Sequence, residues 1–221
     1  MPEVSRRTAP FAASLVLALG VGLPGQVRAE EQYRATEAEK VLLPPLCQAR
    51  LNREEWARSK KRWESVIGPD ALHIHHYCYS LVFINRAKSE TTNRRARKTD
   101  LDAAQGEIGY VLERTTDGSM LAPDFHLTKG EISVLAGEPM EAVKSYRKAT
   151  QIRPNYPKSW LALSDLYKQM GMQQQAREAL EHGLKAAPEK FKDYMKKRLA
   201  ELDANASSPS PAAVAPQPDT K

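Results

Sequence analysis

The chain is poor in aromatic residues and lacks long apolar runs. Only 7% of its 221 residues are aromatic, and it contains 11 glycines and two cysteines. After the first thirty residues there is no run of roughly eighteen apolar residues, which excludes a polytopic membrane protein. The residues that dominate are Ala, Leu, Glu, Lys, Gln and Arg, and these favour α-helix. A hydrophobic content of 41% suffices for one domain with a core, or for a short repeat array.

Signatures of catalysis are also missing. The chain has no Gly-rich phosphate loop, no G-x-S-x-G elbow, no H-E-x-x-H zinc motif and no C-x-x-C-H haem motif. Its acidic residues fall on predicted solvated helix faces. We therefore expect no enzymatic activity and no cofactor.

The formal net charge is +6, but basic residues alternate with acidic ones along the predicted helices. The densest basic cluster spans residues 94–98. A nucleic-acid surface is one interpretation of such a cluster, and a solvated helix face is the other. We favour the solvated face and expect no nucleic-acid partner.

Residues 1–29 have the three-part layout of a secretory signal peptide. Arg6 and Arg7 form a charged start, residues 11–23 form an apolar stretch, and residues 27–29 place small residues before a cleavage point. The apolar stretch is too short to span a bilayer comfortably. The layout predicts a periplasmic or secreted protein with no integral membrane segment after cleavage; an uncleaved N-terminal anchor is the alternative.

Export changes the interpretation of the two cysteines. In an oxidising compartment Cys47 and Cys78 can pair, and the loop so closed would stabilise the fold by about 3 kcal/mol. The alternative is a pair of buried free thiols, which behave as small hydrophobes.

A repeat with a period of 34 residues occupies the C-terminal half. Matching positions, each 34 residues apart, are Gly137 with Gly171, Ala142 with Ala176, Tyr146 with Leu180, Ala149 with Gly183, and Pro154 with Pro188. The glycines are suited to end the first helix of a pair, and the prolines to lie in the turns between pairs. Small residues mark close approaches of two antiparallel helices.

The second copy resembles the tetratricopeptide repeat. Its residues carrying the resemblance are Trp160, Leu163, Ser164, Tyr167, Gly171, Ala176, Leu180, Gly183 and Pro188. The resemblance implies an all-α solenoid of helix-turn-helix repeats, with clear copies at 123–156 and 157–190. His126 and Lys129 depart from the family's apolar preference in the first copy. Gly183 stands where alanine is usual, which we expect to weaken its helix slightly.

Helical patterns outside the repeats predict the rest of the domain, which we place at residues 70–204. Apolar stripes in 70–115 predict a repeat-like hairpin, and those in 189–202 predict a closing helix over the last repeat. Residues 30–69 form an N-terminal segment with one short helix, Arg53 to Val66. Residues 205–221 are rich in Pro, Ala and Ser and predict a disordered tail.

The resemblance also implies a binding surface, because the first helix of each pair lines a concave groove that receives a protein or peptide. The residues placed there are Asp124, Leu127, Glu131, Asn155, Lys158, Leu161, Asp165 and Lys168. Lys158 and Lys168, near Asn155, would receive an acidic segment or a terminal carboxylate. The alternative is that these are ordinary solvent-exposed helix residues. By analogy with the family, we expect a scaffold in a bacterial envelope assembly.

A histidine cluster supplies an alternative function. His73, His75 and His76 lie close to Cys78, and zinc or copper accepts such ligands. A metal site usually needs three or four ligands, and no second cluster supplies the rest. We favour packing and hydrogen bonding near the cysteines, with a metal-binding envelope protein as the alternative. The stretch from Leu43 to Cys47, followed by His75 to Cys78 and by Asn85 to Ala87, resembles an N-terminal module of exported bacterial repeat proteins, and this resemblance implies no particular activity.

Overall fold

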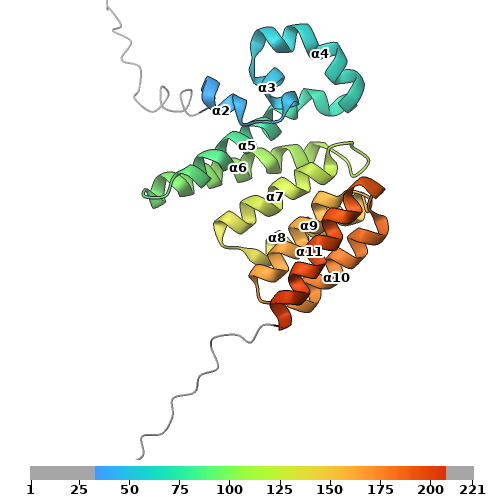
Figure 1. The fold of residues 1–221 in the computed structure, drawn as a ribbon. Coiled ribbons are helices and arrows are strands. Elements are labelled where there is room, and N and C mark those ends of the chain that lie inside the picture. The colour runs from blue at the N-terminus through green and yellow to red at the C-terminus, as the bar shows by residue number, and fades with distance from the viewer. Residues whose placement is uncertain (1–32, 208–221) are drawn as a thin grey trace, which may run out of the picture. The chain divides into compact units, whose positions relative to one another are not determined.

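The computed structural model describes residues 33–207, and every regular element in this range is a helix (Figure 1). The predicted signal peptide, residues 1–29, and residues 208–221 of the predicted tail lie outside the described residues. Residues 205–207, which were predicted to begin the disordered tail, instead end the last helix. None of the described helices is both long and apolar enough to cross a membrane.

The N-terminal segment contains more helices than its sequence predicts. Its elements are α2 (Glu37–Val41), α3 (Pro45–Leu51), α4 (Arg53–Ile67) and a 3-10 helix η1 (Gly68–Leu72). The predicted helix corresponds to α4, whose first turn is capped by Asn52 through the backbone N–H of Glu55 at 3.0 Å. Of the other three elements, α2 and α3 are short helices with local start signals. Thr36 and Glu39 form a capping box on α2, and a proline begins α3.

A helix hairpin follows, as the apolar stripes predict. It consists of α5 (Ile74–Ser89) and α6 (Arg94–Arg114). Asn93 caps α6 by accepting from two backbone N–H groups of its first turn. Phe83 on α5 and Ile108 on α6 are fully buried members of one core cluster that also takes in residues of α3 and α7.

The two predicted repeats form two further helix pairs. These are α7 (Ala122–Ala136) with α8 (Pro139–Ile152), and α9 (Pro157–Gln169) with α10 (Gln173–Ala186). Gly137 and Gly171 have φ angles of 81° and 74° where α7 and α9 end, a conformation that disfavours side chains. Ala142 and Ala176 are completely buried where the paired helices approach closely.

The last helix, α11 (Glu189–Ser207), covers the final pair and continues past the predicted end at residue 202. Its Met195 and Leu202 join the core cluster of α8, α9 and α10. From α5 to α11 each helix contacts the next along the chain (Figure 1). The predicted all-α repeat solenoid with additional N-terminal helices and a C-terminal capping helix is therefore confirmed.

A disulfide joins the N-terminal helices to the stack. Cys47 on α3 and Cys78 on α5 are bonded, with their Cα atoms 5.2 Å apart, and both are fully buried. The bond closes a separation of 31 residues along the chain. It therefore attaches α3 to the helix that begins the stack.

Candidate functional site: a groove along the first helices

The first helices of successive pairs are α5, α7 and α9; α7 contacts each of the other two, and all three line a common surface. A hollow of about 220 Å³ lies on it. Its lining comes from these three helices and from the turn that joins α2 to α3. The lining residues are Leu42, Leu43, Pro44, Tyr77, Leu81, Asn85, Asp124, Leu127, Thr128, Glu131 and Lys158.

The structure brings four of the predicted groove residues together in this hollow: Asp124, Leu127, Glu131 and Lys158. The other predicted residues lie outside it. Leu161, Asp165 and Lys168 follow Lys158 along α9 at helical spacings of three and four. Asn155 is exposed in the turn before α9 and does not line the hollow.

Each predicted acidic residue of the groove has a partner within the protein. The hydroxyl of Tyr156 donates to Asp124 Oδ1 at 2.6 Å. Lys88 on α5 pairs with Glu131, and Arg198 on α11 pairs with Asp165. Burial, followed by the hydrogen bond to Asp124, raises the pKa of Tyr156 above its usual range, so this phenol stays protonated.

The two predicted lysines of the groove lack such ion-pair partners. Lys158 and Lys168 are exposed, and neither has a carboxylate within ion-pairing distance among the side chains that the structure describes. The ammonium of Lys158 lies 5.9 Å from the ring centroid of Tyr156.

Glu131 and Asp165 are neutralised by Lys88 and Arg198, whereas Asp124 is hydrogen-bonded by a neutral phenol and keeps its charge. The two lysines against this one carboxylate leave the surface with a small excess of positive charge.

Several lining residues were not predicted as part of the site. Tyr77, Leu81 and Asn85 are spaced four apart on α5 and therefore share one face. The sequence predicts that Tyr77 and Leu81 belong to a buried stripe. The spacing of four residues that they share with Asn85 was the signal that could have placed all three on one face of the groove. The turn of residues 42–44 was missed because α2 and α3 were not predicted.

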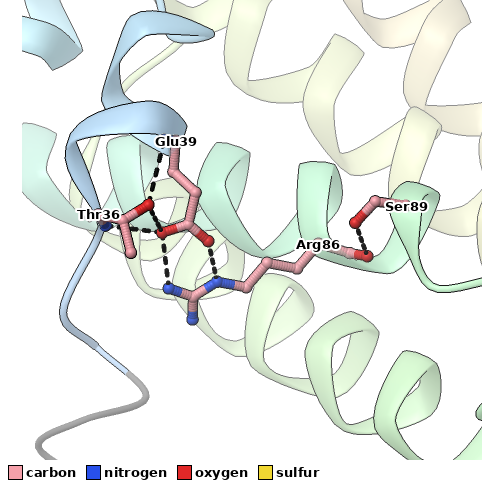
Figure 2. Close-up of polar contacts among 4 residues, drawn as sticks. All are labelled: Thr36, Glu39, Arg86 and Ser89. Carbon is pink, nitrogen blue, oxygen red and sulfur yellow. Dashed lines mark hydrogen bonds and ion pairs between the residues drawn. The ribbon is translucent and has the colours of Figure 1, made fainter.

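This turn is fixed on both sides to α5. Before it, Glu39 forms a two-point ion pair with Arg86: Nε lies 2.5 Å from Oε1 and Nη2 lies 3.1 Å from Oε2 (Figure 2). After it comes the disulfide from Cys47 to Cys78. Within the turn, the Gln48 side chain donates to the carbonyl of Leu43 at 2.8 Å.

The ion pair has a clear electrostatic signature. Hydrogen bonding to Arg86, assisted by hydrogen bonds from Thr36, lowers the pKa of Glu39 from 4.5 to about 2 despite partial burial. The carboxylate thus stays ionised at all but strongly acidic pH. The same carboxylate accepts from the backbone N–H of Thr36 at 2.7 Å, so one side chain both caps α2 and attaches it to α5 (Figure 2).

Comparison with known proteins identifies the helix pairs. Residues 133–197, from the end of α7 into α11, match the family model described as tetratricopeptide repeat. The chain contains tetratricopeptide repeats. Repeats of this family bind protein or peptide partners and are generally non-catalytic, so the groove described above belongs to a protein-interaction fold.

Two solved structures of tetratricopeptide-repeat proteins are similar to this chain. One is a thermophilic protein from Thermus thermophilus, with 19% identity, a TM-score of 0.47 and coverage of 81% of this chain and 87% of that one. The other is the Sgt2 domain from Aspergillus fumigatus, with 18% identity, a TM-score of 0.37 and coverage of 63% and 91%. No curated protein sequence matches the chain.

The histidine cluster lies at the start of α5. His76 packs 3.8 Å from the ring of Tyr110 on α6, and its Nδ1 lies 2.7 Å from Glu107 Oε2. His73 meets the same tyrosine ring edge-on at 5.5 Å. Burial, together with nearby positive charge, lowers the pKa of His75 to about 4. Among the described residues, no group of three or more His, Cys, Asp or Glu side chains is placed to hold a metal ion.

Proposed function

We propose that this protein is an exported scaffold that binds an acidic segment of a partner protein along the surface of α5, α7 and α9. The observation that carries the proposal is the charge pattern of this surface. Asp124, Glu131 and Asp165 are each bound to a partner within the chain, whereas Lys158 and Lys168 have no carboxylate partner among the described residues. An acidic segment or a terminal carboxylate would supply the missing counter-charges.

The spacing of the two lysines sets the scale of the partner. They are ten residues apart on one helix, which corresponds to about 15 Å along its axis. An extended peptide covers that distance with about five residues. One short acidic segment is therefore long enough to reach both ammonium groups.

Export and an envelope assembly are the further parts of the proposal. The layout of residues 1–29 supports export, and a disulfide between Cys47 and Cys78 is compatible with an oxidising compartment. Cell fractionation followed by mass measurement of the purified protein tests this part. We expect an envelope protein that begins at Glu30, and recovery of the full-length chain from the cytoplasm would contradict it.

Charge reversal tests the groove. We expect Lys158→Glu combined with Lys168→Glu to weaken binding of a fluorescein-labelled acidic peptide at least about tenfold, since each exposed charge contact contributes on the order of 0.5–1 kcal/mol and reversal adds repulsion. The matched control is Lys185→Glu with Lys197→Glu, an identical charge change at exposed lysines of α10 and α11. Equal losses in the two variants would refute the groove as the binding surface.

A further inference from the structure

We infer that a second hollow, the N-terminal hollow enclosed by α2, α3 and α4, binds an uncharged saccharide. Its volume is about 480 Å³, within the roughly 300–1,000 Å³ range of sites that bind small molecules. It shares no lining residue with the hollow beside Lys158, and the helices that form it precede the repeats. Binding here would therefore be independent of the groove.

The N-terminal hollow is built from one face of each of its three helices. Its lining residues recur at intervals of three and four along the chain, which places those of each helix on the same side. They are Glu37, Lys40, Val41, Pro45, Gln48, Ala49, Asn52, Glu55, Ser59, Arg62 and Trp63. Charged, apolar and neutral polar side chains thus meet in one hollow, and each group restricts the ligand in a different way.

The charged side chains of the lining balance one another. Two carboxylates, of Glu37 and Glu55, are matched by two cations, Lys40 and Arg62. Lys40 pairs with Glu37 at 2.7 Å, and Glu55 pairs at 2.9 Å with Arg58, which lies outside the lining. Charge complementarity therefore favours a neutral ligand over an anion or a cation.

Apolar side chains form another part of the lining. Trp63 is half-buried against the core cluster and lines the hollow as well. Val41 is 74% exposed, and Pro45 is also exposed. The C–H face of a sugar ring is apolar, so a saccharide can cover this surface and remove it from water.

The polar side chains of the lining keep hydrogen-bonding groups free. The amide nitrogen of Gln48 donates to two carbonyls of the preceding turn, which leaves its oxygen as an acceptor. Asn52 Oδ1 accepts from the backbone N–H of Glu55, which leaves its NH₂ group as a donor. Arg62, whose guanidinium lies 5.7 Å from the centroid of the Trp63 ring, has no carboxylate partner among the described residues. Because a hydroxyl both donates and accepts, a hydroxylated ring can satisfy these groups together.

Much of this lining is held in place before a ligand binds. The hydrogen bonds just described fix Gln48 and Asn52. The ion pair of Glu39 with Arg86 attaches α2 to α5, and the disulfide attaches α3 to the same helix (Figure 2). A pre-formed site loses less entropy on binding, which favours the weak contacts that an uncharged sugar offers.

An NMR titration of the oxidised, ¹⁵N-labelled protein tests the inference through its three indole N–H signals. The neutral titrants are triacetylchitotriose, cellotriose and maltotriose. The charged titrants are chitotriose, the cationic deacetylated form of the first, and trigalacturonate, an anion. We expect a neutral trisaccharide to shift the Trp63 signal saturably and to bind at least about tenfold more tightly than either charged one. The Trp160 signal, from the repeats, is the internal reference and should not move.

Substitutions at exposed lining residues locate the site. Arg62→Ala combined with Val41→Gln removes donors and apolar surface, and we expect it to weaken binding of that trisaccharide at least about tenfold. The matched control is Lys61→Ala with Leu42→Gln, which changes the exposed neighbours of the same two residues, outside the N-terminal hollow. Circular dichroism checks that both variants remain helical, and the comparison of neutral with charged sugars needs no variant.

Several results would overturn the saccharide site. They are an unmoved Trp63 signal with all three neutral sugars, equal affinities for neutral and charged sugars, and equal losses in the variant and its control. Binding that Lys158→Glu with Lys168→Glu abolishes would place the sugar in the groove instead. A dimer in analytical ultracentrifugation that Val41→Gln dissociates would show that a second copy covers the hollow. Failure of the acidic peptide to bind refutes the proposed function alone.

Discussion

Trp160 on α9 covers the backbone of Gly183 on α10 so closely that no side chain fits between them. A Cβ atom at Gly183 would lie 2.6 Å from the Cβ of Trp160 and would also meet the end of Met195. The indole is fixed in place by a hydrogen bond of 2.7 Å from its Nε1 to the carbonyl of Pro154. Residue 183 is therefore glycine rather than the usual alanine because Trp160 packs against its backbone, and the sequence alone does not show this contact.

The first prediction follows from this contact. We expect Gly183→Ala to lower the free energy of unfolding by about 1 kcal/mol, because the overpacking cost of about 1–3 kcal/mol exceeds the gain of up to about 1 kcal/mol in helix propensity. Chemical denaturation of the oxidised protein measures the change.

Gly106→Ala is the matched control for this substitution. Gly106 is in the interior of α6, and a Cβ there meets nothing within 4 Å. The same change should therefore stabilise the protein, by up to about 1 kcal/mol. A stabilising effect at both glycines would show that the contact with Trp160 relaxes at no cost.

The second prediction concerns the pH dependence of stability. The pKa of Glu39 is lowered by folding, from 4.5 to about 2. Its contribution is therefore fully present above pH 4.5 and is lost as the pH falls toward 2. After allowance for solvent screening, we expect this contribution to be about 1 kcal/mol.

Glu39→Gln isolates that contribution because the amide can still accept the hydrogen bond from Thr36 but carries no charge. We expect the variant to be less stable than the wild type at pH 7 and to approach it near pH 2, as measured by urea unfolding. Glu37→Gln, in the same helix and exposed, is the control and should follow the wild type. A constant difference between Glu39→Gln and wild type at every pH would exclude the ion pair as its cause.

The third prediction concerns the hydrogen bond from Tyr156 to Asp124, which joins the turn before α9 to α7. We expect Tyr156→Phe to lower the free energy of unfolding by about 1.5–3 kcal/mol, the range for a hydrogen bond to a charged group. Repeating the substitution in an Asp124→Asn background completes a double-mutant cycle. An equal loss in that background would mean that the hydroxyl acts through other groups.

The repeat region was predictable because its pattern is periodic and long. Gly137 and Gly171 end α7 and α9 with positive φ, and the small residues 34 apart lie where helices approach. Backbone geometry requires glycine at the first kind of position, and close packing requires a small residue at the second. Both requirements can be recognised in the local sequence. The helices α2 and α3 have five and seven residues, too few for a periodic stripe, so only their capping residues gave a signal.

The site was predictable only in part, for a related reason. Helical spacing places Lys158 and Lys168 on one face without further information. The partner of Glu131 is 43 residues away, and that of Asp165 is 33 residues away. Pairing at such distances depends on how α5 and α11 pack against their neighbours, and no local pattern encodes it. The charge excess of the groove therefore became visible only in the folded structure.

The two attachments of the N-terminal turn also limit where the chain can change in length. Cys78 and Arg86 are eight residues apart on one rigid helix, about 12 Å along its axis, and the segment from Glu39 to Cys47 joins their partners. An insertion between those two residues must either bulge over the hollow or release one attachment. The exposed residues 91 and 92, in the turn between α5 and α6, carry no such attachment among the described residues, since the hydrogen bonds there are local and go to Glu90. That turn is therefore the better place for a tag or a fused domain.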